Sequence, residues 1–190
     1  MKYHAIVFDL DGTIADTERL WKEVTNGFLH SRGITLTQEE KENLHAQLHG
    51  AGLKPACTLI KKLFAIDDPL HEIINEKVRR ALELYEKEVQ FIEGFTDFHA
   101  KLRPHGLKSG IATNADDHTL GRLKRALKLE DFFGEHIYNI SHVNNIAKPH
   151  PALYEHAAAQ LDISPIQCVA IEDSAVGIEA AQRAGMFCIG

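Results

Sequence analysis

The stretch Phe8-Asp-Leu-Asp-Gly-Thr13 decides the fold, because it directly continues a short run of apolar residues. His4–Leu10 is apolar at nearly every position and β-branched at Ile6 and Val7, which predicts a strand buried on both faces. Such strands are typical of parallel sheets covered by helices. Two aspartates at the carboxyl end of a buried strand are costly unless they are paired or bind a ligand, so the stretch also marks a candidate site.

The same kind of apolar run recurs along the chain. Four further strands are predicted at Leu107–Ala112, Ile137–Ile140, Gln167–Ile171 and Met186–Ile189. Helices are predicted around and between these strands at about Asp97–Arg103, Asp117–Leu127, Ala152–Leu161 and Ala175–Ala184. The alternation predicts an α/β fold, a doubly wound Rossmann-like parallel sheet with right-handed crossovers.

Between the first and second strands the patterns are helical only. Thr37 and Glu40 have capping-box spacing, Pro55 can begin a helix, and Asp68-Pro69 predicts an N-cap followed by proline at N1. An apolar stripe with helical spacing then follows: Leu70, Ile73, Ile74, Lys77, Val78, Ala81, Leu82 and Tyr85. We therefore expect an all-helical cap domain (16–88) inserted into a Rossmann-like catalytic core (1–15 and 89–190).

Composition excludes several classes of protein. The 190 residues are 44% hydrophobic and 25% charged, as in ordinary globular domains, and no apolar run approaches the roughly 18 residues of a membrane span. A formal net charge of −6 favours neither nucleic acid nor an acidic membrane surface as a partner. The three scattered cysteines indicate reduced thiols, and the N-terminus does not resemble a signal peptide, so a cytoplasmic protein is expected.

Polar residues follow the other predicted strands at the point where each ends. Thr113-Asn114 follows the second strand, Lys148 comes shortly after the third, and Glu172-Asp173 follows the fourth. Since the carboxyl ends of parallel strands meet at one edge of a sheet, we expect these residues to lie close to Asp9 and Asp11. Carboxylates gathered there predict a divalent cation, and a set of oxygen ligands favours Mg²⁺ over zinc.

The Asp9 and Asp11 side chains leave the same face of an extended backbone, which suits one nucleophile and one proton carrier. The hydroxyls of Thr13 and Thr113 and nearby backbone N–H groups can bind an anion. The positive charge of Lys148 would offset an electrostatic repulsion, because a carboxylate nucleophile and a phosphate dianion repel each other. At 4 Å that repulsion is about 4 kcal/mol at an effective dielectric of 20, enough to slow attack roughly a thousandfold.

Among the 12 histidines, His45 and His49 form the one pair with helical ligand spacing. No third ligand is spaced nearby in the sequence. We therefore expect an exposed helix face there rather than a zinc site.

Four segments carry a resemblance to a known family: Phe8-Asp-Leu-Asp-Gly-Thr13, Ala112-Thr-Asn114, Ala147-Lys-Pro-His-Pro151 and Ile171-Glu-Asp-Ser-Ala-Val-Gly-Ile178. The chain resembles, over nearly its whole length, the haloacid dehalogenase superfamily hydrolases of the β-phosphoglucomutase and phosphoglycolate-phosphatase-like subgroup. The resemblance implies a Rossmann-like core with a helical cap after the first strand. Such relatives usually continue past the fifth strand, so a shortened chain with an uncovered sheet flank is expected after Gly190.

The resemblance also implies roles for individual residues. Asp9 is implied to be the nucleophile that forms a phosphoaspartate, and Asp11 the general acid and base. Asp9, Asp173 and the Asp11 backbone carbonyl are implied to hold Mg²⁺, with Glu172 a ligand or a partner of one. The phosphoryl group is implied to bind Thr113 and Lys148, while Asn114 either faces the substrate or caps the following helix.

The presence of Asp11 narrows the range of activities that the family resemblance implies for this chain. Dehalogenases and phosphonate hydrolases resemble the family without Asp11, although Lys54 matches a cap lysine of the latter. A β-phosphoglucomutase would be expected to carry a histidine near Trp21 and an arginine near Leu53, which this chain lacks. We expect a Mg²⁺-dependent phosphatase acting on a small phosphomonoester, as a monomer or weak dimer. The alternatives are a phosphosugar mutase and a non-hydrolytic relative that only binds a phosphorylated metabolite.

Overall fold

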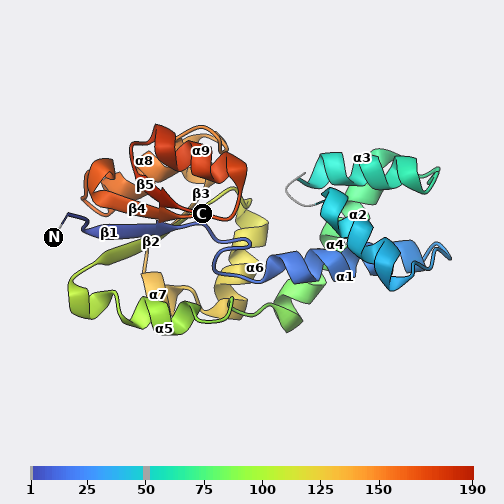
Figure 1. Ribbon diagram of the computed structural model, residues 1–190, viewed down its shortest axis with the longest axis horizontal. Helices are drawn as coiled ribbons and strands as arrows, with labels where there is room; N and C mark the ends of the chain where they lie inside the picture. Colours follow the sequence, from blue (N-terminus) through green and yellow to red (C-terminus); the bar gives the residue numbers. More distant parts are fainter. Residues whose placement is uncertain (1, 49–51) are drawn as a thin grey trace. The chain divides into compact units, whose positions relative to one another are not determined.

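The computed structural model describes residues 2–48 and 52–190. Its five strands form one parallel sheet in the order β3-β2-β1-β4-β5 (Figure 1). They are β1 (Ala5–Phe8), β2 (Lys108–Thr113), β3 (Ile137–Asn139), β4 (Cys168–Ile171) and β5 (Phe187–Ile189). The expected doubly wound α/β fold is confirmed, because the strand order reverses at β1 and every paired neighbour is parallel.

Strand β1 is the centre of the sheet and is buried at all four positions. Its pairing is in register with both neighbours, since Phe8 lies opposite Ile111 of β2 and Ile171 of β4. The residues that follow β1 and β4 therefore leave the sheet at the same level. This register brings Asp9 and Glu172 to adjacent strand ends although they are far apart in the sequence.

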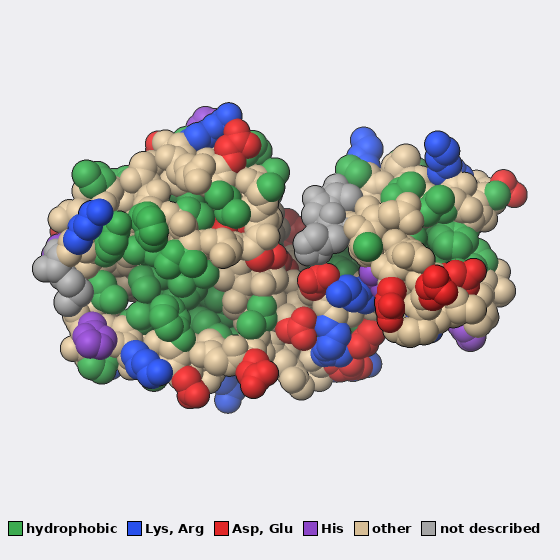
Figure 2. All heavy atoms as spheres, viewed as in Figure 1, with side chains coloured by type: hydrophobic (Ala, Val, Ile, Leu, Met, Phe, Trp, Pro, Cys, Tyr) green, Lys and Arg blue, Asp and Glu red, His purple; other side chains and the backbone are tan. Residues whose placement is uncertain are grey.

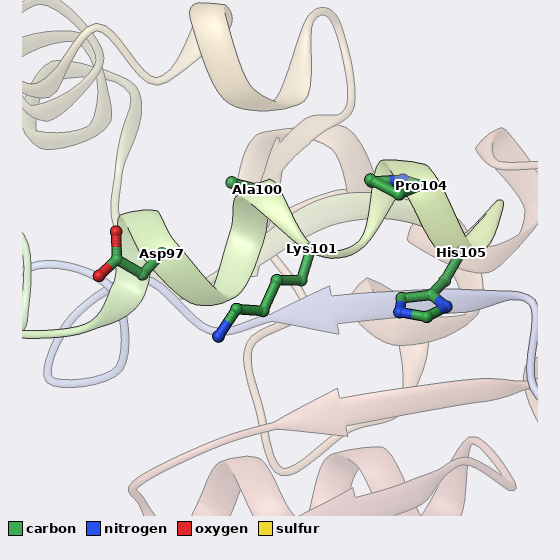
Figure 3. Close-up of a pocket in the computed structure, with 5 residues that line it drawn as sticks. All are labelled: Asp97, Ala100, Lys101, Pro104 and His105. Carbon is green, nitrogen blue, oxygen red and sulfur yellow. The ribbon is translucent and has the colours of Figure 1, made fainter.

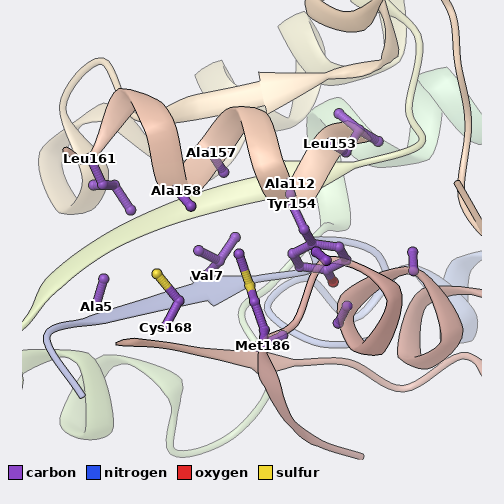
Figure 4. Close-up of a cluster of buried hydrophobic side chains, with 14 of the residues drawn as sticks. Ala5, Val7, Ala112, Leu153, Tyr154, Ala157, Ala158, Leu161, Cys168 and Met186 are labelled. Carbon is purple, nitrogen blue, oxygen red and sulfur yellow. The ribbon is translucent and has the colours of Figure 1, made fainter. Parts of the chain in front are cut away.

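Helices cover both faces of the sheet, with α8 and α9 on one side and α5 and α7 on the other (Figure 1). The helices of this unit are α5 (Phe95–Ala100), α6 (Asp117–Leu127), α7 (Glu130–Phe133), α8 (Ala152–Gln160) and α9 (Ala175–Arg183). Three short 3₁₀ turns connect them: η1 (Arg103–His105), η2 (Ile140–Val143) and η3 (Pro165–Gln167). Helix α8 packs on β1, β2 and β3, and its apolar side chains belong to a buried cluster that also contains residues of β4 and α9. Figure 4 labels Ala157 and Ala158 of α8, Val7 of β1 and Cys168 of β4 in this cluster.

The chain divides into two compact units. One runs up to Thr17 and resumes at Glu86, and the other comprises Glu18–Tyr85. The second unit draws on helices α1 (Thr17–His30), α2 (Gln38–Leu48), α3 (Leu53–Leu63) and α4 (Leu70–Glu88), and its described residues include no strand. Its buried core contains Phe28, Leu29, Leu44, Cys57, Ile60, Ile66 and Ile73.

Capping residues and prolines in the sequence predict some helix starts correctly and others not. The capping box is confirmed: the Thr37 backbone N–H donates to Glu40 Oε2 at 2.8 Å, and the Glu40 N–H donates to Thr37 Oγ1 at 3.3 Å. Helix α3 begins two residues before Pro55, whose missing N–H costs nothing in a first turn. The Asp68 carboxylate accepts a bond from Arg32 Nε at 2.9 Å, a tertiary contact that no local pattern predicts.

One sequence prediction includes a residue that the structure does not describe. His49, Gly50 and Ala51 lie outside the described residues, so the expected His45/His49 helix face stays a prediction. The His45 ring lies 3.2 Å from Asn26 Oδ1. The three cysteines are all free thiols, and no described helix is long and apolar enough to cross a membrane.

The sheet unit carries a group of apolar side chains on the face shown in Figure 2. Strand β5 is an edge strand, with Phe187 54% exposed and Ile189 49% exposed. The Phe187 ring stacks on Tyr3, with centroids 5.8 Å apart. Strand β5 therefore presents exposed apolar side chains at the edge of the sheet.

Lys77 is an exception in the apolar stripe of α4, because it is a charged residue that is 2% exposed. Its ammonium donates to Thr25 Oγ1 at 2.9 Å, and the Thr25 hydroxyl donates to the Trp21 carbonyl at 2.9 Å. Burial lowers the pKa of Lys77. A buried ammonium is costly to the folded state, since one hydroxyl replaces only part of its lost hydration.

We predict that Lys77→Met raises the free energy of unfolding at pH 7 by about 1–2 kcal/mol, because methionine removes the desolvated charge. The folded pKa is below the unfolded value of about 10.4, so the unfolded wild type binds the extra proton and its stability rises with pH in that window. The advantage of the variant should therefore shrink towards pH 10, as urea unfolding at several pH values would measure. Lys62→Met, at an exposed position of α3, is the control and should change little.

Candidate active site

The site is built at the carboxyl end of β1, where a buried lysine joins two carboxylates. Lys148 Nζ lies 2.5 Å from Asp9 Oδ1 and 2.5 Å from Glu172 Oε1. The Lys148 side chain is 2% exposed and that of Glu172 is fully buried. The structure thus brings together residues that follow β1, β3 and β4, as the sequence predicts for one edge of a parallel sheet.

Asp11 lies beside this group and is held by hydroxyls. The Thr113 hydroxyl, at the end of β2, lies 3.4 Å from Asp11 Oδ2, and the Thr17 hydroxyl at the start of α1 also hydrogen-bonds the Asp11 carboxylate. Burial raises the pKa of Asp11, while the two hydroxyl bonds act in the opposite direction. A carboxyl group with a raised pKa and fixed orientation is suited to carry a proton in both directions.

Gly12 lets Asp173 approach the first turn after β1. Its φ is +85°, and a Cβ placed there would lie 2.2 Å from Asp173 Oδ2, so any other residue would meet both strain and a clash. The Thr13 hydroxyl donates to Asp173 Oδ1 at 3.0 Å. The glycine and threonine of Asp-x-Asp-Gly-Thr therefore set the position of a carboxylate from another strand.

Both oxygens of Glu172 are engaged by protein donors. Oε1 accepts from Lys148 and from the Tyr154 hydroxyl at 2.8 Å. Oε2 accepts from the Ser174 hydroxyl at 2.9 Å and the Ser174 N–H at 3.3 Å. Gly177 of α9 gives the carboxylate its space, since a Cβ there would lie 1.9 Å from Glu172 Cδ.

Asn114 makes a contact that neither sequence alternative predicted. Its Oδ1 accepts the Lys148 backbone N–H at 2.9 Å, so it connects the end of β2 to the loop that carries the lysine. The N-cap of α6 is Asp116, whose carboxylate accepts from Thr119 N at 2.8 Å; the capping alternative for Asn114 was therefore wrong. Whether Asn114 also faces substrate stays a prediction.

The electrostatics of the site favour a bound cation. Burial raises the pKa of Asp9 to about 8, although Lys148 acts in the opposite direction. Burial likewise raises the pKa of Asp173 against the Thr13 hydrogen bond. Burial alone would lower the pKa of Lys148, but Asp9 and Glu172 raise it, so this lysine stays charged.

Asp9, Glu172 and Asp173 each offer an oxygen, and these three atoms lie within 4.8 Å of one another. The spacing and the all-oxygen chemistry fit Mg²⁺. Glu172 is already satisfied by three protein groups, so Asp9 and Asp173 are the carboxylates with room for the ion. The metal-ligand roles predicted from the sequence stay predictions, with Glu172 the weakest of them.

Two surface hollows lie outside this group of residues. One, of about 350 Å³, follows α5 and η1, where the side chains of Lys101 and His105 point to the same side of the helix (Figure 3). The other, of about 660 Å³, lies over α6, α7 and η2. Neither is lined by a residue predicted for the site. The second is lined by Asp117, Glu130 and Glu135, which are not in the group of described carboxylates close enough to share a metal ion.

No role at the site was predicted for three of its contributors: Tyr154, Ser174 and Gly177. Ser174 could have been found, because a serine before an apolar helix is an N-cap signal, and its Oγ does accept the Gly177 N–H at 3.1 Å. Tyr154 sits in an apolar helix pattern like any core residue. Nothing in the local sequence marks its hydroxyl.

Comparison with known proteins gives the family. Residues 3–185 match the haloacid dehalogenase-like hydrolases, and the chain belongs to this family. Hexitol phosphatase B of Escherichia coli strain K12 is 28% identical over 96% of this chain and 80% of its own length. A phosphorylated carbohydrates phosphatase of Thermotoga maritima is 30% identical over 96% and 82% respectively.

Solved structures agree with this assignment. A family hydrolase from Deinococcus radiodurans R1, solved with bound phosphate and sodium, has a TM-score of 0.81 and 30% identity, covering 98% of this chain and 80% of that one. The chain is therefore an enzyme of this hydrolase family, in the class of the phosphoric monoester hydrolases.

We predict that Gly177→Ala lowers kcat/KM for phosphoester hydrolysis at least tenfold, because its Cβ must displace the Glu172 carboxylate. The crowding should also lower the free energy of unfolding by about 1–3 kcal/mol. Steady-state kinetics and urea unfolding measure the two effects. Gly121→Ala on α6 is the matched control: its nearest neighbour is 3.7 Å away, so activity should hold and helix propensity should add up to about 1 kcal/mol.

Proposed function

We propose that this enzyme is a Mg²⁺-dependent phosphatase that hydrolyses a small phosphomonoester, such as a sugar phosphate, through an aspartyl phosphate on Asp9. The observation that carries the proposal is the contact between the Asp9 carboxylate and the buried Lys148 ammonium, with Asp11 beside them. The named activities of the two phosphatase relatives support a phosphorylated carbohydrate as substrate.

In the first step, a carboxylate oxygen of Asp9 attacks phosphorus and the bond to the substrate oxygen breaks. The leaving oxygen takes the proton of Asp11, whose pKa is raised by burial, so a protonated fraction is available. In the second step Asp11 accepts a proton from water, and that water oxygen attacks phosphorus. The bond to Asp9 breaks, inorganic phosphate leaves, and both carboxyl groups return to their starting forms.

Charge is the main obstacle to both steps, since an anion attacks an anion. Lys148 stays charged and lies against Asp9, where it can also bind a phosphoryl oxygen. The Thr113 hydroxyl, within 3.4 Å of Asp11, offers a neutral donor. When bound by Asp9, Asp173 and the Asp11 carbonyl, Mg²⁺ would supply further positive charge at the phosphoryl group.

We expect the substrate to be a small phosphorylated metabolite handled in the cytoplasm by a monomer or weak dimer. Neither nucleic acid nor membrane is expected as a partner, given the net charge of −6. A phosphosugar mutase would use the same Asp9 and Asp11 but would return the phosphoryl group to the sugar. Product analysis separates it from a phosphatase.

We predict that the wild type with Mg²⁺ releases inorganic phosphate from at least one member of a panel of sugar and hexitol phosphates. Asp9→Asn should lower kcat at least a thousandfold, because the amide is a poor nucleophile. Asp97→Asn, at an exposed position of α5, should match wild type. Equal rates for wild type and Asp9→Asn would contradict the proposal, and isomerised sugar phosphate without net phosphate release would indicate a mutase.

For Asp11→Asn, we predict a burst. With p-nitrophenyl phosphate the leaving group needs little protonation, so attack by Asp9 continues while activation of water fails. Rapid mixing should release about one p-nitrophenolate per enzyme and then slow at least a hundredfold, with the phosphoryl group retained on the protein by mass. A uniform slowing without a burst would remove Asp11 from the second step.

A further inference from the structure

Tyr154 contacts the active site from the side of the core and has no part in the steps above. It is fully buried on α8, and Figure 4 shows its side chain projecting from that helix towards the sheet. A buried phenol hydroxyl is costly without a partner. Here the partner is Glu172 Oε1, which accepts the hydroxyl at 2.8 Å.

The Tyr154 ring contacts the Lys148 ammonium, which forms the buried ion pair with Glu172. Lys148 Nζ lies 4.9 Å from the centre of the Tyr154 ring, within the range of a cation–π interaction. Glu172 Oε1 accepts from both the Tyr154 hydroxyl and Lys148 Nζ. Tyr154 therefore touches the carboxylate through its oxygen and the ammonium through its ring, and the two contacts can be removed separately.

The hydroxyl matters because the lysine has two competing acceptors. Lys148 Nζ is shared between Asp9 Oδ1 and Glu172 Oε1. Ser174 holds only the far oxygen of Glu172. Without the tyrosine oxygen, Lys148 alone would orient Oε1, and movement of that carboxylate would carry the ammonium away from its place beside Asp9.

We propose that Tyr154 is a positioning residue of this enzyme, whose hydroxyl holds Glu172 so that Lys148 stands against Asp9. The expected kinetic effect rests on the proposed phosphatase function. The expected effect on the position of the Lys148 ammonium does not. Tyr154 touches no substrate and gives up no proton. It acts through Glu172, which in turn acts through Lys148.

The variant Tyr154→Phe keeps the ring and removes only the oxygen. We expect kcat/KM to fall about tenfold, which corresponds to about 1.4 kcal/mol. Tyr138→Phe is the matched control, because Tyr138 is also buried and its hydroxyl pairs with His136 Nδ1 at 2.9 Å, outside the site. The control should stay within twofold of wild type; a Tyr154→Phe enzyme that also does so overturns the proposal.

A double-mutant cycle separates positioning from packing. Glu172→Met is nearly isosteric and leaves no oxygen for the tyrosine to hold. In that background, adding Tyr154→Phe should change kcat/KM less than twofold, because the route to Lys148 is already broken. The same tenfold loss in both backgrounds would show that the hydroxyl acts through the core instead.

A spectroscopic measurement tests the geometry without turnover. In protein labelled with ¹⁵N at lysine side chains, the Lys148 ammonium signal is identified by its loss in Lys148→Met. Tyr154→Phe should shift that signal and Tyr138→Phe should leave it in place; an unmoved signal in Tyr154→Phe overturns the proposal. Failure of the phosphatase function would instead appear as equal, absent turnover in wild type and Asp9→Asn.

Discussion

The structure of the site depends on one buried ammonium, that of Lys148, placed between the carboxylates of Asp9 and Glu172. Taking these charges out of water costs several kcal/mol per ion, and only close pairing with further hydrogen bonds offsets the cost. The surrounding groups supply these bonds. Tyr154 and Ser174 hold Glu172, and Asn114 holds the backbone of Lys148 itself.

The parallel sheet makes this pairing possible at low conformational cost. Because β1 and β4 are in register from Ala5 to Phe8, Asp9 and Glu172 leave adjacent strands at the same level. Two glycines then remove the side chains that would block the approach: Gly12 beside Asp173, and Gly177 beside Glu172. The backbone geometry alone therefore places the carboxylates of Asp9, Glu172 and Asp173 close to one another.

The sequence predicted the elements whose signals are local. The helix predicted at Asp117–Leu127 matches the structure, where Leu120, Leu123 and Leu127 have helical spacing and are buried. The residues that end the strands were found from the apolar runs before them. Tertiary contacts were not predictable in the same way. Asp68 pairs with Arg32, 36 positions away in the sequence. The Asn114 side chain accepts a hydrogen bond from the Lys148 backbone N–H, 34 positions away.

The same limit explains why Tyr154 was missed and why the sequence left two roles open for Glu172, a metal ligand or a partner of one. A carboxylate after a buried strand predicts a partner but does not say which one, since a lysine, a hydroxyl and a cation all satisfy it. In the structure the donors of Glu172 come from the loop before α8, from α8 itself and from the cap of α9. Lys148 contacts both Asp9 and Glu172, and the ligand roles of Asp9, Glu172 and Asp173 stay predictions.

The balance of charges at the site bears on how the proposed phosphate substrate would bind to an acidic protein. Around Lys148 the site gathers Asp9, Asp11, Glu172 and Asp173, and burial raises the pKa of the three aspartates. Such an excess of carboxylates repels a phosphate dianion and attracts a divalent cation. In the proposed function, a bound divalent cation would offset two of these negative charges and lower the repulsion that a phosphate dianion meets at Asp9. The proposed function therefore predicts that metal binding precedes substrate binding. The net charge of −6 for the whole chain includes these carboxylates, and its more distant charges have little influence because salt screens them beyond about 8–10 Å.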